Sequence, residues 1–273
     1  MFGQYPLHSP INLTVLFFST NRMNYLRQSL ESFHDMINWQ DTNIRKILID
    51  DYPLGRNDHE FEELKDRYNI DTMILHEENK GQSATWREAW DILPEDTDFI
   101  WHQEDDFIFP TELNGKALIK CMIMLAPQAL QIALKRQQWY ADENDFVCKI
   151  NNGDSGEEHR ITHEMGGIDD FFIFHEEYFV ANPCIYPYWV TQEKYKHNPQ
   201  ESVIMNHFHM STPKMSSVIY GRRQDPPRCI HIGDYNQGRK VLEGEPGWDW
   251  LKFYEVDKKY DSKGYLKEWK EDE

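Results

Sequence analysis

Residues 13–19, Leu-Thr-Val-Leu-Phe-Phe-Ser, form a continuous apolar run. A short run of this kind is typical of a β-strand that is buried on both faces of a sheet. Apolar side chains then recur at steps of three and four, the spacing of one face of an amphipathic helix: Met23, Leu26, Leu30, Phe33 and Ile37. A buried strand followed by a helix is therefore expected over residues 13–37.

The same alternation continues as far as residue 102. Further strands are predicted at 45–50 (RKILID), 72–76 (TMILH) and 98–102 (DFIWH). The segments between them carry helical spacing, at Phe61, Leu64 and Tyr68 and at Trp86, Ala89, Trp90 and Leu93. Strand–helix alternation predicts parallel strands with right-handed crossovers, and ligands of such sheets bind at the carboxyl ends of the strands. The polar residues just after each strand are thus the candidate site.

The second half of the chain has a different character. Aromatic and proline-containing apolar runs at 171–174, 178–190, 216–221 and 229–233 replace the regular alternation. We interpret residues 117–130 (ALIKCMIMLAPQAL) as a core helix and the glycine- and acid-rich residues 151–170 as a long loop. This half is expected to be mixed sheet and loops packed over one end of the first half.

The composition of the chain limits the classes of function that the protein can have. The formal net charge is -18, from 47 acidic and 29 basic residues, which is opposite in sign to that of a general nucleic-acid binder. An acidic protein can still bind an anionic nucleotide when a divalent cation bridges the two. Four cysteines without metal-binding spacing indicate reduced thiols, and neither a signal peptide nor a membrane-spanning run is recognisable, so a cytoplasmic location is expected.

The strongest functional signal is the run Glu104-Asp105-Asp106, which follows the predicted strand at 98–102 directly. Adjacent carboxylates raise one another's pKa unless a cation neutralises them. Carboxylate oxygens are the ligands that Mg²⁺ and Mn²⁺ prefer, and such sites leave positions open for a diphosphate. A solvated acidic turn is the plain alternative for this run taken alone.

Three weaker signals lie at the ends or starts of neighbouring elements. Thr20-Asn21-Arg22 follows the first strand, Asp50-Asp51 ends the second, and Asn79-Lys80-Gly81 leads into a helix that contains Arg87. An ordinary turn or a helix cap explains each of them separately. Their order along the chain, followed by the acidic strand end, is more specific than any single one.

In that order the motifs resemble those of the GT-A glycosyltransferases, in particular the inverting, family-2-like group. The resemblance covers roughly residues 12 to 235. It implies a GT-A-type α/β domain over 1–245, with a Rossmann-like nucleotide-sugar-binding half (1–112) merged with a mixed-sheet acceptor half (113–245). Residues 246–273 remain as a charged amphipathic tail that docks on the body or mediates homo-oligomerisation.

The resemblance also implies a nucleotide-sugar donor, a UDP-sugar, and Mn²⁺ or Mg²⁺. Asp51 corresponds to the acid that contacts the uracil. Gln103 stands where the first Asp of the Asp-x-Asp motif is often found, so the motif leaves open which acid binds the metal directly. The implied metal ligands are Asp105, Asp106 and His231. The implied donor-binding residues are Thr20, Asn21, Arg22, Asp51, Asn79, Lys80, Gly81, Arg87, Glu104, Asp105, Arg222 and Arg223.

Transfer of the sugar requires a carboxylate that takes the proton of the acceptor hydroxyl. Glu201 is the first candidate for this base, and Asp169 and Asp170 are held in reserve. A structural role for Glu201, as an acid at a helix N-terminus, is nearly as well supported. Arg222, Arg223 or Lys80 would add positive charge at the leaving phosphate.

The sequence thus predicts an inverting glycosyltransferase whose acceptor is a glycan, a lipid or a protein. Three alternatives stay open. A glycosyltransferase acting on hydroxymethylated bases of phage DNA is disfavoured by the net charge. A sugar-phosphate nucleotidyltransferase usually has a glycine-rich phosphate loop, which the first turn, STNRMNY, lacks. A nucleotide-sugar-binding protein without catalysis is the third.

Overall fold

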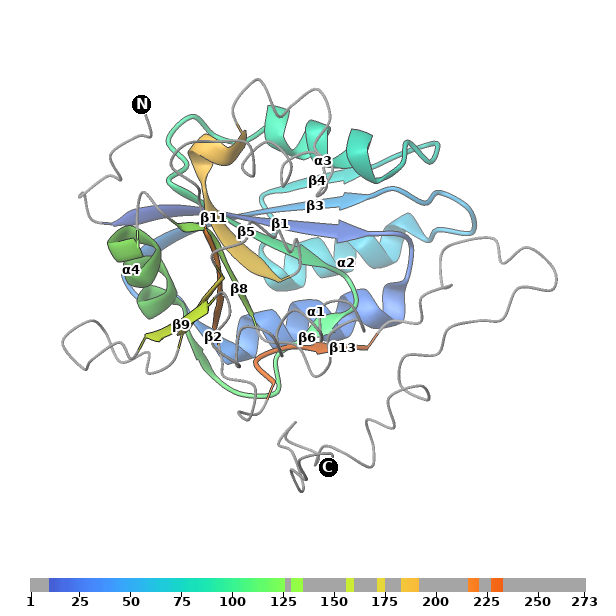
Figure 1. The fold of residues 1–273 in the computed structure, drawn as a ribbon. Helices are drawn as coiled ribbons and strands as arrows, with labels where there is room; N and C mark the ends of the chain where they lie inside the picture. Colours follow the sequence, from blue (N-terminus) through green and yellow to red (C-terminus); the bar gives the residue numbers. More distant parts are fainter. Residues whose placement is uncertain are drawn as a thin grey trace, which may run out of the picture.

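The computed structural model describes residues 10–125, 129–134, 156–159, 171–174, 183–191, 216–220 and 227–232. Within these ranges the main sheet is mixed and has nine strands, which come from both halves of the chain (Figure 1). The predicted domain limits and the predicted tail over 246–273 depend on segments outside the described residues and stay predictions.

The four strands predicted in the first half are all present. They are β1 (Ile11–Ser19), β3 (Thr42–Asp50), β4 (Thr72–Leu75) and β5 (Phe99–Glu104), and they run parallel as β4-β3-β1-β5. The three predicted helices are confirmed as well. They are α1 (Met23–Met36), α2 (Asp58–Tyr68) and α3 (Gln82–Asp91).

The described strands of the second half extend the same sheet beyond β5 and do not pack over its end, whereas the loops predicted in this half lie outside the described residues. β11 (Cys184–Pro187) pairs antiparallel with β5 and joins it to β8 (Ala129–Leu134). β12 (Ser216–Tyr220), β10 (Phe171–Phe174) and β9 (Gly156–His159) follow. The sheet is therefore mixed, as predicted, but continuous.

Two predicted segments need correction. The core helix expected over 117–130 is α4 (Gly115–Leu125), and residues 129 and 130 already belong to β8. Residues 156–159, within the expected loop 151–170, form β9. The boundary between α4 and β8 lies within one apolar run, where periodicity alone does not separate a helix from a strand. β9 (GEEH) is polar and has no apolar pattern that would predict a strand.

Short pairings complete the described architecture. β13 (Ile230–His231) lies antiparallel to β6 (Phe107–Ile108) (Figure 1). β2 (Ile37–Asn38) lies parallel to β7 (Leu113–Asn114). A 3-10 helix, η2 (Tyr188–Thr191), follows β11. In the described part of the chain, none of the helices has the length and hydrophobicity needed to cross a bilayer.

The packing on both faces of β1 explains why its sequence is apolar at successive positions. Val15 and Phe17 belong to the core cluster that includes side chains of α1 and α2, whereas Leu16 and Phe18 belong to the cluster that includes Trp86 of α3. Figure 1 shows α1 and α2 on one side of the sheet and α3 on the other. Both faces of the strand are therefore covered by helices.

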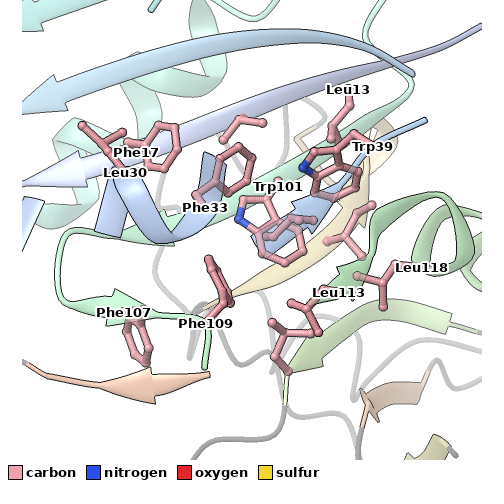
Figure 2. Packing of buried hydrophobic residues seen from close by; sticks show 14 of the residues in the cluster. Leu13, Phe17, Leu30, Phe33, Trp39, Trp101, Phe107, Phe109, Leu113 and Leu118 are labelled. Carbon is pink, nitrogen blue, oxygen red and sulfur yellow. The ribbon is translucent and has the colours of Figure 1, made fainter. Parts of the chain in front are cut away.

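Aromatic rings fill the core beneath α1. Trp39 meets Trp101 edge to face, with ring centroids 5.4 Å apart, and Phe33 lies 6.1 Å from Trp101 (Figure 2). A Cβ added at Gly115 would collide with the Trp39 ring, which explains the glycine at the first position of α4. Cys121, Cys184 and Cys229 are buried and are not joined to one another by a disulfide, and Cys148 lies outside the described residues.

A histidine is buried beside the hydrophobic cluster that contains Leu16, Phe18 and Trp86. His102 is fully buried, and its ring centroid lies 4.6 Å from the rings of both Phe18 and Trp86. Its Nε2 atom has no hydrogen-bond partner among the described residues. Burial disfavours the charged ring and lowers the pKa of His102 from 6.5 to about 3.

We expect acid to destabilise the protein through His102. In the unfolded chain the His102 ring takes up a proton near pH 6.5, whereas in the folded protein it does so only near pH 3. The contribution of His102 to the stability of the folded protein is therefore complete above pH 6.5 and is lost as the pH falls toward 3. Between about pH 7 and 5 the free energy of unfolding should fall by about 2 kcal/mol on this account. Urea unfolding at both pH values measures this fall in the free energy of unfolding. His102→Phe should shrink the difference by that amount, and an unchanged difference would contradict the assignment.

Candidate functional site

The register of the parallel strands brings their carboxyl ends together. Ser19 of β1 is paired with Asp50 of β3, and Phe18 is paired with Glu104 of β5. The turns that follow these strands, and the turn after β4, therefore lie along one edge of the sheet. The sequence predicted this edge as the candidate site.

The first turn depends on a left-handed residue. Asn21 has a φ of 59°, a region that Asn tolerates better than most side chains. Its N–H donates to Asp50 Oδ2 at 2.6 Å, and its Nδ2 donates to the Leu54 carbonyl at 2.8 Å. These bonds tie the turns after β1 and β3 together and place Arg22 at the start of α1.

Asp105 and Asp106, called here the acidic pair, are both buried. The Arg22 guanidinium lies on both of them: Nε is 3.2 Å from Asp105 Oδ2, Nη1 is 2.7 Å from Asp106 Oδ2, and Nη2 contacts Asp105 Oδ1. Ser19 Oγ and the Thr20 N–H also donate to Asp105 Oδ2, at 3.2 and 3.3 Å. The acidic run is thus not bare, because the protein supplies a cation of its own.

Charge and burial oppose each other in this cluster. Burial raises the pKa of Asp105 above its usual value, although Arg22 acts against this. For Asp106 burial also acts upward, but His231 and Arg22 outweigh it and lower the pKa. Burial acts to lower the pKa of Arg22, yet the two carboxylates raise it overall, so the guanidinium stays charged.

His231 reaches the acidic pair through the β13–β6 pairing. The Ile232 N–H donates to the Asp106 carbonyl at 2.8 Å, and His231 Nε2 lies 3.1 Å from Asp106 Oδ2. The imidazole also lies against Phe107, with ring centroids 4.8 Å apart. His231, 125 residues away in sequence, is therefore in contact with an implied metal ligand.

The acidic pair offers one ligand position for a cation. Asp106 Oδ1 is buried and has no hydrogen-bond partner among the described residues. A group of three acidic, histidine or cysteine side chains that could hold a metal alone does not occur in the described ranges. Mg²⁺-like ions, however, are usually bound by one or two carboxylates together with substrate phosphates and water. The residues present fit a cation of that kind, held through Asp106.

Asp51 organises the neighbouring turn. The residue is only 5 % exposed, and its carboxylate accepts hydrogen bonds from the N–H groups of Lys80 at 2.8 Å and Gly81 at 2.7 Å. His76 Nδ1 lies 2.6 Å from the same carboxylate, and Gly81 adopts a φ of 83°. Asp51 thus holds the turn between β4 and α3, and its predicted contact with a uracil stays a prediction.

Sequence reasoning missed part of this network. Glu88 of α3 lies 2.9 Å from His76 Nε2 and 2.8 Å from Lys80 Nζ, so it supports the turn from the helix side. Gln82 Nε2 lies 3.5 Å from Glu104 Oε1, which links the start of α3 to the acidic run. The only available signal was the position of His76 directly after a strand.

The remaining predicted residues differ in what the structure says of them. Asn79 and Arg87 are exposed, at the turn before α3 and on α3 respectively. The candidate bases and two candidate phosphate ligands lie outside the described residues: Glu201, Asp169, Asp170, Arg222 and Arg223.

Comparison with known proteins supports the fold. No family model and no curated protein matches the sequence. Among solved structures, the mannosyltransferase PcManGT from Pyrobaculum calidifontis, in complex with GDP-Man and Mn²⁺, is similar over 83 % of this chain and 58 % of its own, with 9 % identity and a TM-score of 0.51. S. aureus TarS 1–349 in complex with UDP-GlcNAc is similar over 78 % and 59 %, with 11 % identity and a TM-score of 0.49.

The similarity to the mannosyltransferase shows the fold alone. The chain spans less than two thirds of either protein, at 58 % and 59 % of their lengths. The central sheet, mainly parallel in its first half and mixed beyond β5, has the GT-A-type α/β architecture of the mannosyltransferase. The predicted fold class is therefore confirmed.

We expect Asp51→Asn to loosen the turn after β4. An amide in place of the carboxylate cannot accept from the Lys80 and Gly81 N–H groups with both atoms, so one of these partly buried donors loses its partner, at a cost of about 1 kcal/mol. Thermal unfolding measures the loss, and hydrogen exchange of the Lys80 and Gly81 amides locates it. Asp66→Asn, at an exposed position of α2, is the matched control. Unchanged exchange at both amides would contradict the role given to Asp51.

Proposed function

We propose that the protein is a metal-dependent glycosyltransferase that moves a sugar from a nucleotide sugar, a UDP-sugar, to an acceptor hydroxyl with inversion. The observation that carries this proposal is the buried Asp106 Oδ1 at the carboxyl edge of a GT-A-type sheet, which has no hydrogen-bond partner among the described residues. Support comes from the mannosyltransferase of similar fold, whose structure contains GDP-Man and Mn²⁺.

The donor diphosphate is proposed to bind over the acidic pair. The divalent cation, Mn²⁺ or Mg²⁺, would be held by Asp106 with His231 and Asp105 beside it, and it supplies charge neutralisation at the leaving diphosphate. The guanidinium of Arg22 lies at the same place and matches the geometry of phosphate oxygens. Glu104, the first turn (20–22), the turn at 79–81 with Arg87, and Arg222 and Arg223 complete the proposed donor site.

The transfer step needs a base on the acceptor side. The bond between the anomeric carbon and the donor phosphate oxygen breaks, and the nucleoside diphosphate leaves with that electron pair. The acceptor oxygen forms the new bond and loses its proton to a carboxylate. We propose Glu201 for this carboxylate, with Asp169 or Asp170 in its place if Glu201 is dispensable. The acceptor class is a glycan, a lipid or a protein.

A panel of UDP-, GDP- and other nucleotide sugars tests the proposal through slow donor hydrolysis. We expect release of nucleoside diphosphate from at least one donor only when Mn²⁺ or Mg²⁺ is present. Asp106→Asn should lower this rate about 100-fold or more, because charge stabilisation by a metal contributes several kcal/mol. The control is again Asp66→Asn, and circular dichroism verifies that the variants fold.

Two results would count against the proposal. The first is the absence of metal-dependent release with every donor in the panel. The second is release of pyrophosphate from a nucleoside triphosphate and a sugar phosphate, which would instead identify a nucleotidyltransferase.

A further inference from the structure

Arg22 contacts the acidic pair with all three of its guanidinium nitrogens. Nε and Nη2 contact the two oxygens of Asp105, and Nη1 contacts Asp106 Oδ2. Three of the four carboxylate oxygens therefore have Arg22 as a partner. The fourth, Asp106 Oδ1, has no hydrogen-bond partner among the described residues.

Hydrogen bonds hold the backbone of Arg22 at the start of α1, whereas its side chain is partly exposed. The Arg22 carbonyl accepts from the N–H groups of Tyr25 and Leu26, at 2.9 and 3.0 Å, at the start of α1. The side chain does not cap the helix, and 14 % of it is exposed. The side chain thus reaches solvent, and moving it would break none of the backbone hydrogen bonds at the start of α1.

We propose that Arg22 acts as an intramolecular counter-cation, which occupies the acidic pair in the donor-free protein and transfers to the donor diphosphate when a divalent cation binds at Asp106. Metal and nucleotide then bind cooperatively, each strengthening the other. This inference rests on the proposed function, because it requires a metal and a diphosphate at this edge.

The physical argument is one of competing cations. A divalent ion bound alone at Asp106 would lie beside a guanidinium that shares the same carboxylates, and displacing that guanidinium would leave a buried charge unpaired. A diphosphate removes the conflict, because guanidinium pairs with phosphate oxygens as well as with carboxylates. Coupling of two ligands is reciprocal, so UDP must raise the affinity for Mn²⁺ by the same factor as Mn²⁺ raises that for UDP.

The experiment measures Mn²⁺ binding without turnover. Electron paramagnetic resonance of free Mn²⁺ gives the affinity of the full chain with and without UDP, after correction for the Mn²⁺ that UDP itself chelates. For the wild-type protein, UDP should raise the affinity about 10-fold or more. Arg22→Gln should bind Mn²⁺ alone about 10-fold more tightly than wild type, and UDP should then add little.

Arg56→Gln is the matched control. The Arg56 side chain is 8 % exposed and pairs with Asp50 and Asp58, but it does not contact the acidic pair. If the effect is specific to Arg22, this variant should show the coupling of the wild-type protein. An equal gain in Mn²⁺ affinity in both variants would overturn the inference.

Other outcomes separate this inference from the function on which it rests. A folded Arg22→Gln variant that binds Mn²⁺ no more tightly than wild type overturns the inference and leaves the metal site intact. If that variant fails to fold, Arg22→Lys takes its place, because lysine keeps the charge but lacks the forked geometry. Arg22→Lys should show a smaller gain in Mn²⁺ affinity of the same sign. No gain in Mn²⁺ affinity would overturn the inference. A wild-type protein that binds neither Mn²⁺ nor UDP overturns both.

Discussion

Asp105 and Asp106 lie buried at the edge of the sheet, and taking a carboxylate out of water carries a penalty of several kcal/mol unless other groups replace the water. Here those groups come from distant segments. The turn after β1 supplies Arg22, and the strand β13 supplies His231. The acidic pair can therefore stay buried only while β1, β5 and β13 are held together. This requirement ties the site to the fold.

The parallel pairing of β1 with β3 and β5 meets most of that requirement. Because the strands are in register at Ser19 and Asp50, the turn after β1 is bonded both to Asp50 and to Asp105. The short β13–β6 pairing then adds His231 from the far end of the described chain. Secondary structure of only two residues per strand is enough here, because the Ile232–Asp106 backbone bond fixes the position of the histidine.

The sequence predicted which elements form this edge of the sheet, but not which side chains are in contact there. β1, β3, β4 and β5 have short apolar runs, so these strands and the polar turns after them could be predicted. The partners could not, because Arg22 and Asp105 are 83 positions apart and no local pattern links them. The acidic run did indicate a cation, but a run of carboxylates does not reveal whether that cation is a metal or a side chain.

The two adjacent aspartate pairs show what only the structure distinguishes. Asp50-Asp51 and the acidic pair both follow buried strands, and all four side chains are buried. Every carboxylate oxygen of Asp50 and Asp51 accepts from donors inside the protein, namely Asn21, Tyr52, Arg56, His76, Lys80 and Gly81. The acidic pair leaves Asp106 Oδ1 unpartnered among the described residues. An unsatisfied buried acceptor is costly, and a cation from outside removes that cost at this pair alone.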